Sequence, residues 1–159
     1  MSTTVDETAT AVPWLDEQEM VAWRGFAETV FDLLRALETD IAGLGLTLGD
    51  YQVLVQLSEA PERSMRMCDL AVLLQLTPSG LTRRLDGLVR TGDVERVPSQ
   101  QDRRVMLARI TDDGMRRLEG AAPTHVRSVR ARFLDPVDPA DLDAVGRAFL
   151  AIRAGLHTD

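Results

Sequence analysis

Apolar residues recur at alternating intervals of three and four through the first third of the chain, which predicts one long helix. Asp16 and Glu19 form a capping pattern at its start, and it runs to about Leu44, where Gly43 and Gly45 interrupt it. Further apolar residues widen the face beyond one stripe, so a single small lobe has difficulty burying it and a second chain would cover it. The repeating positions are Met20, Trp23, Ala27, Val30, Leu34, Leu37, Ile41 and Leu44.

The middle of the chain indicates short helices followed by two strands. Thr47 and Asp50 start the first helix, which ends near Pro61. Thr77 caps a later helix, and Pro78 takes its first position, where a missing N–H costs nothing. The other predicted elements are a very short strand at 64–66, helices at 67–76 and 78–91, strands at 94–97 and 105–110, and a loop at 98–104.

The remainder of the chain is predicted to be helical. Thr111 begins a helix with two acidic residues at its positive end. Pro123 must end or kink this helix, because proline lacks an N–H and clashes with the preceding turn. Another helical stretch follows at 124–133, and a last helix starts at Asp138–Pro139.

The charge distribution changes the interpretation of these elements. The net charge is −7, which alone argues against a nucleic-acid partner, but residues 63–132 hold fourteen arginines and eight acidic residues, a net of +6. Phosphates respond to this local surface, because salt screens charges beyond about 8–10 Å. The alternative is a salt-bridged surface with chance clustering. The excess coincides with the helix–turn–helix and loop, which favours a DNA-binding surface.

The outward side of the helix at 78–91 carries candidate DNA contacts. Arg83 can form two hydrogen bonds with a guanine edge, worth about 1–3 kcal/mol of discrimination. Ser79 and Thr82 can bond a phosphate or a base edge, and the helix start at Thr77 suits a phosphate. Arg84 adds a second cation. The alternative for each residue is a solvated polar face.

The loop at 98–104 carries a second group of candidates. Arg103 and Arg104 lie at its tip, and a guanidinium suits the narrow minor groove. Asp102 is acidic where an acid repels phosphate, so its expected role is to hold Arg104 in one rotamer. The alternative is a surface ion pair of little energetic value.

A series of motifs covers nearly the whole chain after residue 15. They are Leu46-Thr47-Leu48 with Tyr51 and Leu54, Asp69-Leu70-Ala71, the run from Leu76 to Leu88, Gly92 to Arg96, Asp102-Arg103-Arg104, and Leu107 to Gly114. With these motifs the chain resembles the MarR family of winged helix-turn-helix transcription regulators. It departs from the family pattern at Gly80 and Gly87, each of which costs a helix about 0.5–1 kcal/mol relative to alanine, and in having no lysine. For Gly80 two roles stay open: close backbone approach to DNA, or only a weaker helix.

The resemblance implies a mainly α fold with a small β-wing. Its parts are a disordered tail at 1–13, an N-terminal dimerisation helix at 14–45, a winged helix-turn-helix lobe at 46–111 and C-terminal dimerisation helices at 112–159. It further implies an obligate homodimer that binds a pseudo-palindromic double-stranded operator, usually as a repressor. Many relatives release DNA when a small aromatic acid or phenol binds; Trp23, Arg24, Phe26 and Tyr51 are the candidate pocket here, the alternative being that Trp23 and Phe26 belong to the dimer core.

Other functions receive less support from the sequence. No Ser/His/Asp set, phosphate loop or carboxylate–His cluster indicates an enzyme, and we expect no cofactor. His125 and His157 are too far apart to argue for a metal site. Cys68 invites a redox reading, but structural burial is the expected role. The single cysteine, the polar N-terminus and the absence of a long apolar run favour a cytoplasmic protein with no membrane contact. A winged-helix module for protein–protein contact is the main alternative.

Overall fold

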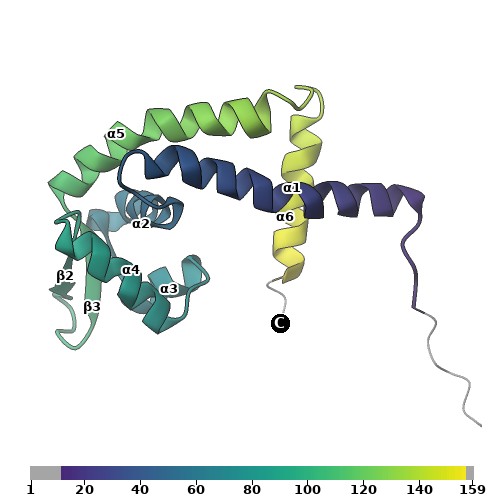
Figure 1. The fold of residues 1–159 in the computed structure, drawn as a ribbon. Coiled ribbons are helices and arrows are strands. Elements are labelled where there is room, and N and C mark those ends of the chain that lie inside the picture. The colour runs from purple at the N-terminus through teal and green to yellow at the C-terminus, as the bar shows by residue number, and fades with distance from the viewer. Residues whose placement is uncertain (1–11, 157–159) are drawn as a thin grey trace, which may run out of the picture.

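The computed structural model describes residues 12–156, and within this range the fold is mainly helical with one small antiparallel sheet (Figure 1). This architecture confirms the predicted fold class. The predicted tail at 1–13 and His157 fall largely or wholly outside the described residues. The elements are α1 (Glu17–Ala42), α2 (Leu48–Glu59), η1 (Pro61–Arg63), β1 (Ser64–Arg66), α3 (Met67–Leu73), α4 (Pro78–Arg90), β2 (Val94–Pro98), β3 (Met106–Ile110), α5 (Asp112–Val129), η2 (Arg130–Leu134) and α6 (Leu142–Leu156).

Helix α1 starts as its sequence predicts. The Asp16 side chain accepts a hydrogen bond from the Glu19 N–H at 2.8 Å, and the Glu19 side chain accepts one from the Asp16 N–H at 2.9 Å. The helix ends at Ala42, two residues before the expected Leu44. Gly45 follows with φ +71°, a conformation that glycine adopts without a steric penalty.

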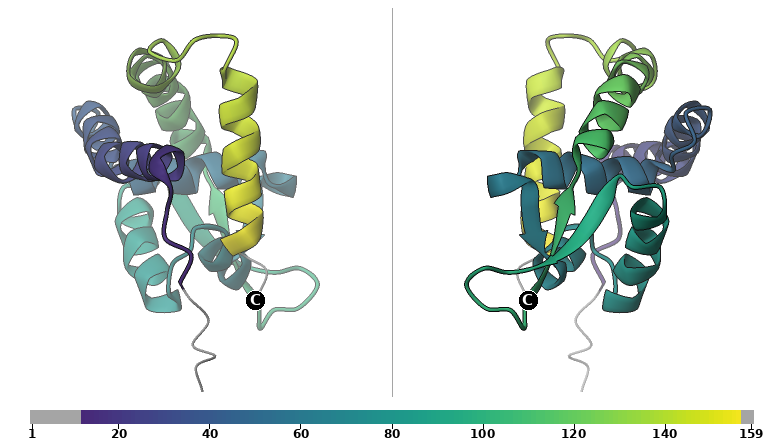
Figure 2. Two further views of the ribbon diagram at one scale, coloured as in Figure 1. Left: turned by 90° about the vertical axis from the view of Figure 1, so that its right-hand side faces the viewer. Right: turned by 90° about the vertical axis from the view of Figure 1, so that its left-hand side faces the viewer.

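The sheet has the strand order β1-β3-β2, with both pairs antiparallel. The predicted short strand at 64–66 is therefore real and lies at one edge. Strand β2 pairs with β3 from Val94 opposite Ile110 to Pro98 opposite Met106. The loop between these strands extends outward from the lobe in both views of Figure 2.

One hydrophobic core holds α2, α3, α4 and the sheet together. Its fully buried side chains come from every one of these elements and from the end of α1. The largest are Ile41, Leu54, Leu57, Leu70, Leu81, Leu85, Val53 and Val94. Burial of each such side chain stabilises the fold by about 1.5–3 kcal/mol, so α4 is held firmly along its inner face.

A buried polar cluster joins this lobe to α1 and α5. Asp93, 3% exposed, follows the end of α4 and accepts a hydrogen bond from Nη1 of Arg117 in α5 at 2.6 Å. Nη2 of the same arginine donates to the carbonyl of Gly45 at 2.6 Å. Gly114 lies directly against the carbonyl oxygen of Asp93, with no room for a side chain. The cluster therefore fixes the lobe to the connection between α1 and α2.

The helix α5 is longer than the sequence predicts. It continues through Pro123 to Val129, where the π-helical turn η2 begins. The sequence predicted that Pro123 ends or kinks this helix, and the helix does not end there. The predicted stretch at 124–133 is the second half of α5 together with η2. The last helix begins at Leu142 rather than at Asp138–Pro139.

Apolar side chains remain exposed on α1 and α6. In Figure 1, α6 descends from the end of α5 and crosses α1 away from the core of the lobe. No α6 residue is buried. The large exposed side chains on these helices are Val21, Trp23, Phe26, Phe31, Leu34, Phe149, Leu150, Ile152 and Leu156. None of the helices within residues 12–156 is long and apolar enough to cross a membrane.

Candidate nucleic-acid interface

Helices α3 and α4 meet through a tight turn. Gln75 has φ +53° in this turn, and the N–H of Leu76 bonds the carbonyl of Ala71 at 2.9 Å. Thr77 then caps α4, since its Oγ1 accepts the N–H of Gly80 at 3.1 Å, as the sequence predicts. At the other end Gly92 has φ +80°, the expected left-handed termination.

The polar residues of the first two turns of α4 face solvent. Ser79, Thr82 and Arg83 are exposed, while Leu81 and Leu85 on the opposite side are buried. The Thr82 hydroxyl donates to the carbonyl of Pro78 at 2.9 Å, which leaves its oxygen as an acceptor. This outward placement matches the arrangement that we expected for groove contacts.

Arg84 behaves differently from its neighbour. It is among the expected DNA contacts, but its Nη1 donates to Oγ1 of Thr47 at 3.3 Å and lies 3.6 Å from Oδ1 of Asp50. Both partners belong to the start of α2. The Arg84 side chain is 30% exposed, so it packs on the lobe.

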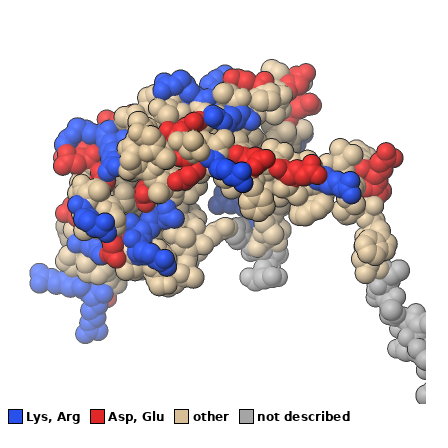
Figure 3. All heavy atoms as spheres, in the orientation of Figure 1, with Lys and Arg blue, Asp and Glu red and all other residues tan. Residues whose placement is uncertain are grey.

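The loop between β2 and β3 carries Arg103 and Arg104 at an exposed tip. In Figure 3 basic side chains project from the lower left of the molecule, beyond the rest of the surface. Asp102 accepts the backbone N–H of Arg104 at 3.0 Å and forms no ion pair with its guanidinium. The expectation that Asp102 fixes the Arg104 rotamer is therefore wrong; its carboxylate fixes the backbone of the tip.

An ion pair connects the wing to α4. Nη2 of Arg96 in β2 donates to Oδ1 of Asp86 at 2.8 Å and to the carbonyl of Thr82 at 3.2 Å. Because Arg96 is half-buried, this contact limits the movement of β2 against α4. The reading helix and the wing are thus presented as one unit.

Sorting the arginines by partner separates structural cations from free ones. Ten of the eighteen form ion pairs within residues 12–156. Among the arginines for which this range holds no acidic partner, five belong to the helix-turn-helix and wing. They are Arg66, Arg83, Arg90, Arg103 and Arg104. A free arginine leaves its five donors available to phosphate.

Sequence reasoning missed Arg66 and Arg90. Arg66 immediately precedes α3, and Arg90 ends α4. Asp86 lies one helical turn before Arg90 and is a candidate ion-pair partner in the sequence. In the structure Asp86 pairs with Arg96 of β2 instead, so Arg90 has no acidic partner within residues 12–156. Only the tertiary structure shows this.

The residues expected to form an effector pocket divide into two groups. The rings of Trp23 and Phe26 lie 6.1 Å apart on α1, and Phe26 lies 6.4 Å from Phe149 of α6. Tyr51 is buried in α2, with its ring 4.5 Å from that of His125 in α5. Arg24 is exposed. Within one chain Phe26 thus lies near α6, whereas Tyr51 packs against α5.

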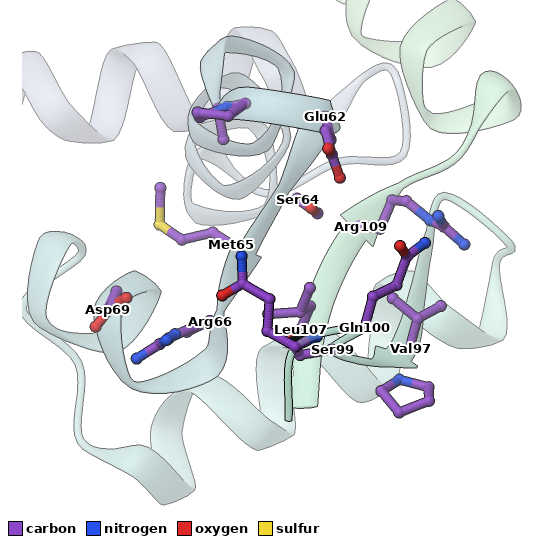
Figure 4. Close-up of a pocket in the computed structure, with 14 residues that line it drawn as sticks. Glu62, Ser64, Met65, Arg66, Asp69, Val97, Ser99, Gln100, Leu107 and Arg109 are labelled. Carbon is purple, nitrogen blue, oxygen red and sulfur yellow. Dashed lines mark hydrogen bonds between the residues drawn. The ribbon is translucent and has the colours of Figure 1, made fainter. Parts of the chain in front are cut away.

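A groove lies elsewhere, between η1, β1 and the base of the wing. It has a volume of about 560 Å³. Figure 4 shows Arg66 and Asp69 on one side and Glu62 and Arg109 on the other, above an apolar floor that includes Leu107. Its mixed charge and a lining without any α1 residue distinguish it from the expected effector pocket.

The remaining side chains of interest are Cys68, His125 and Tyr51. Cys68 is exposed and its Sγ lies 3.4 Å from Oδ1 of Asp69, so the expected structural burial is wrong. Burial lowers the pKa of His125, and burial raises the pKa of Tyr51. Within residues 12–156 no group of three His, Cys, Asp or Glu side chains is placed to hold a metal ion.

Comparison with known proteins agrees with this geometry. The sequence model of the MarR family matches residues 44–105. The crystal structure of AbsC, a MarR family transcriptional regulator from Streptomyces coelicolor, is 36% identical, with a TM-score of 0.86, and the match covers 92% of this chain and 99% of that one. The chain belongs to the MarR family.

Two further relatives are informative. Sco3205 from Streptomyces coelicolor, solved in complex with DNA, is 31% identical with a TM-score of 0.85, over 92% of this chain and 96% of that one. The transcriptional repressor YetL of Bacillus subtilis (strain 168) is 31% identical over 65% of this chain and 64% of its own length. This chain thus spans less than two thirds of the curated relatives that it matches. The relatives are regulators rather than enzymes, which confirms that expectation.

Proposed function

We propose that this MarR family protein is a sequence-specific, homodimeric repressor that binds double-stranded DNA. The observation that carries the proposal is the set of arginines without an acidic partner on α4 and the wing, all on one lobe. Arginines left unpaired in the free protein lose no ion pair when they meet phosphate. The structure of Sco3205 in complex with DNA and the repressor function of YetL support this proposal.

Each proposed contact follows from its position on the lobe. Arg83 reads a base edge in the major groove, with Ser79 and Thr82 beside it. The capped start of α4 at Thr77 receives a phosphate. The tip arginines enter the minor groove, where negative potential is concentrated. Arg103 and Arg104 are this pair, and Asp102 holds the tip's backbone ready for them.

The homodimer is proposed from the exposed apolar side chains of α1 and α6. Nine large ones on these two helices are between 44% and 76% exposed in the single chain, and water contact with so much apolar surface is unfavourable. A two-fold pair would place two α4 helices about 34–36 Å apart, one turn of duplex. A pseudo-palindromic operator would match that symmetry.

A response to a small aromatic ligand is also proposed. Trp23 and Phe26 offer apolar ring surfaces and Arg24 a guanidinium, which suits an aromatic carboxylate. Since Tyr51 lies apart from them in one chain, a shared pocket would need the partner's surface to complete it. The cytoplasmic location stays a prediction.

Fluorescence anisotropy with labelled duplex DNA tests the central proposal. Fragments retained by the purified protein from a genomic library are sequenced to supply the operator. Affinity should fall steeply with salt. Arg83→Ala should weaken operator binding about 5- to 160-fold, in keeping with about 1–3 kcal/mol for a lost bidentate contact. Arg104→Ala should weaken it and reduce the salt slope.

Arg35→Ala is the matched control, since this exposed arginine of α1 pairs with Asp32 far from α4 in the chain. It should bind like the parent. If Arg83→Ala and Arg104→Ala also bind like the parent, the assigned DNA face is wrong. If no duplex binds at low salt, the protein-interaction module becomes the better description.

A further inference from the structure

Arg83 and Arg84 are adjacent in α4, yet their side chains leave the helix in different directions. Arg83 is exposed and has no acidic partner within residues 12–156. The Arg84 guanidinium lies so close to Gly49 that a Cβ at Gly49 would overlap it. Only one of two chemically identical side chains is therefore presented outward.

The surface that receives Arg84 is itself rigid. Thr47 and Asp50 form a reciprocal capping box at the start of α2: Oγ1 of Thr47 accepts the Asp50 N–H at 3.0 Å, and Oδ2 of Asp50 accepts the Thr47 N–H at 3.1 Å. The same two side chains hold Arg84, at 3.3 Å and 3.6 Å. Because α2 is anchored in the core through Leu54 and Leu57, the contact attaches α4 to a fixed point.

Helix α4 has a specific need for such a contact. It contains Gly80 and Gly87, and glycine inside a helix allows more backbone freedom than any other residue. Its buried leucines hold one face, and Arg96 ties its outer side to β2. The directional contact from Arg84 to the start of α2 is a further polar tie that opposes rotation of α4 about its axis.

We propose that Arg84 is a positioning residue that sets the rotation of α4, so that Ser79, Thr82 and Arg83 face the groove, and that it does not touch DNA. This inference rests on the proposed DNA-binding function. It also gives Gly49 a role, because a Cβ at that position would overlap the guanidinium.

A positioning residue and a phosphate contact differ in two measurable quantities. Loss of a phosphate contact lowers affinity for all sequences alike and reduces the salt slope by about 0.9 per contact. Loss of a positioning contact disturbs the base contacts, so it lowers the ratio of operator affinity to affinity for unrelated duplex and leaves the slope unchanged. The ratio and the slope therefore separate the two roles.

The first experiment measures both quantities for Arg84→Gln, with the operator obtained from retained fragments and an unrelated duplex of equal length. We expect the affinity ratio to fall about fivefold with an unchanged slope. A slope that decreases by about 0.9 per chain, with equal losses on both duplexes, overturns the proposal. An unchanged ratio overturns it as well.

The second experiment displaces the guanidinium but keeps its charge. Gly49→Ala places a methyl group where the guanidinium lies, and alanine is the better helix former. We expect the same fall in the ratio without a lower melting temperature, and a Gly49→Ala/Arg84→Gln double variant no worse than either single one. Gly120→Ala, at an open position of α5, is the control and should bind like the parent. Parent-like binding by Gly49→Ala overturns the proposal.

The outcomes distinguish this inference from the proposed function. If the parent binds no duplex, both fail. If the parent binds, Arg83→Ala weakens binding and Arg84→Gln does not, only the positioning role of Arg84 is lost.

Discussion

At Gly114 the backbone of α5 lies against the carbonyl oxygen of Asp93, and the N–H of Gly114 bonds Oγ1 of Thr111 at 3.0 Å. A Cβ would overlap that carbonyl, and backbone cannot swing aside as a side-chain end can. We expect Gly114→Ala to lower the free energy of unfolding by about 1–3 kcal/mol, as overpacking of rigid sites does. Urea unfolding at fixed protein concentration measures it.

Gly120 provides the comparison within the same helix. It is exposed, and a Cβ there would meet nothing within 4 Å. Gly120→Ala should raise stability by about 0.5–1 kcal/mol, because alanine restricts the unfolded chain and favours helix. Equal effects of the two substitutions would contradict the close packing of α5 against Asp93.

His125 makes stability depend on pH. Its Nδ1 is buried without a hydrogen-bond partner within the described chain, and burial lowers its pKa below the ordinary 6.5. Tyr51, the ring against it, stays neutral because burial raises the Tyr51 pKa. Between the lowered pKa and 6.5 the unfolded chain binds a proton that the folded chain does not.

The folded state should therefore lose stability as pH falls below about 6.5, and the loss should be complete once pH passes the lowered pKa. Urea unfolding at pH 7.5 and pH 5.5 should show a larger decrease for the parent than for His125→Gln, which cannot titrate. A variant with the same decrease as the parent would show that other groups cause it.

Arg83 and Arg84 on α4 show how far the sequence predicts where a single side chain lies. Periodicity correctly predicted that Arg83 faces solvent, since it lies opposite the leucine stripe. The same reasoning placed Arg84 among the expected DNA contacts, and nothing in the local sequence shows that its side chain contacts Thr47 and Asp50. Cys68 likewise looked suited to burial, yet it is exposed. Contacts between residues distant in the chain decide these cases.

At the scale of elements, local signals predicted the starts of helices well. The capping patterns at Asp16 and Thr47 and the cap at Thr77 all form as expected. Chain-local rules were weaker at helix interiors and ends. Pro123 lies inside α5, which continues for six residues beyond it. Packing of α5 against α1 and α2 outweighs the local cost of the proline.

Replacing Pro123 should remove this local destabilisation of α5. Pro123 is exposed, so its replacement loses no core packing, and alanine restores an N–H to bond the carbonyl of Glu119. We expect Pro123→Ala to stabilise the protein by about 1–3 kcal/mol, raising the melting temperature in calorimetry. A lower melting temperature would show that the proline shapes α5 for its packing.

At the scale of the whole molecule, the sequence indicated a helix too apolar for one lobe to cover, and the fold shows where that surplus lies. It continues from α1 onto α6, whose exposed residues include Leu150 and Ile152. Periodicity could not place α6 against α1, because that crossing depends on the length of α5 and on the turn after it. The sequence pattern and the fold therefore both favour a second chain that covers this apolar surface.

The homodimer is tested by placing one charge on each of two exposed apolar sites. Leu150 on α6 is 66% exposed, and Val72 on α3 in the lobe is 79% exposed. The parent should scatter light as twice the chain mass of 17.6 kDa at micromolar concentration. Leu150→Asp should shift it toward one chain, since an unpaired carboxylate in an apolar interface costs several kcal/mol. Val72→Asp should stay dimeric. A monomeric parent, or dissociation of both variants alike, would contradict an interface built on α1 and α6.

Because half of the arginine-bearing surface is lost on dissociation, Leu150→Asp should also bind the operator with about half the parent's salt slope.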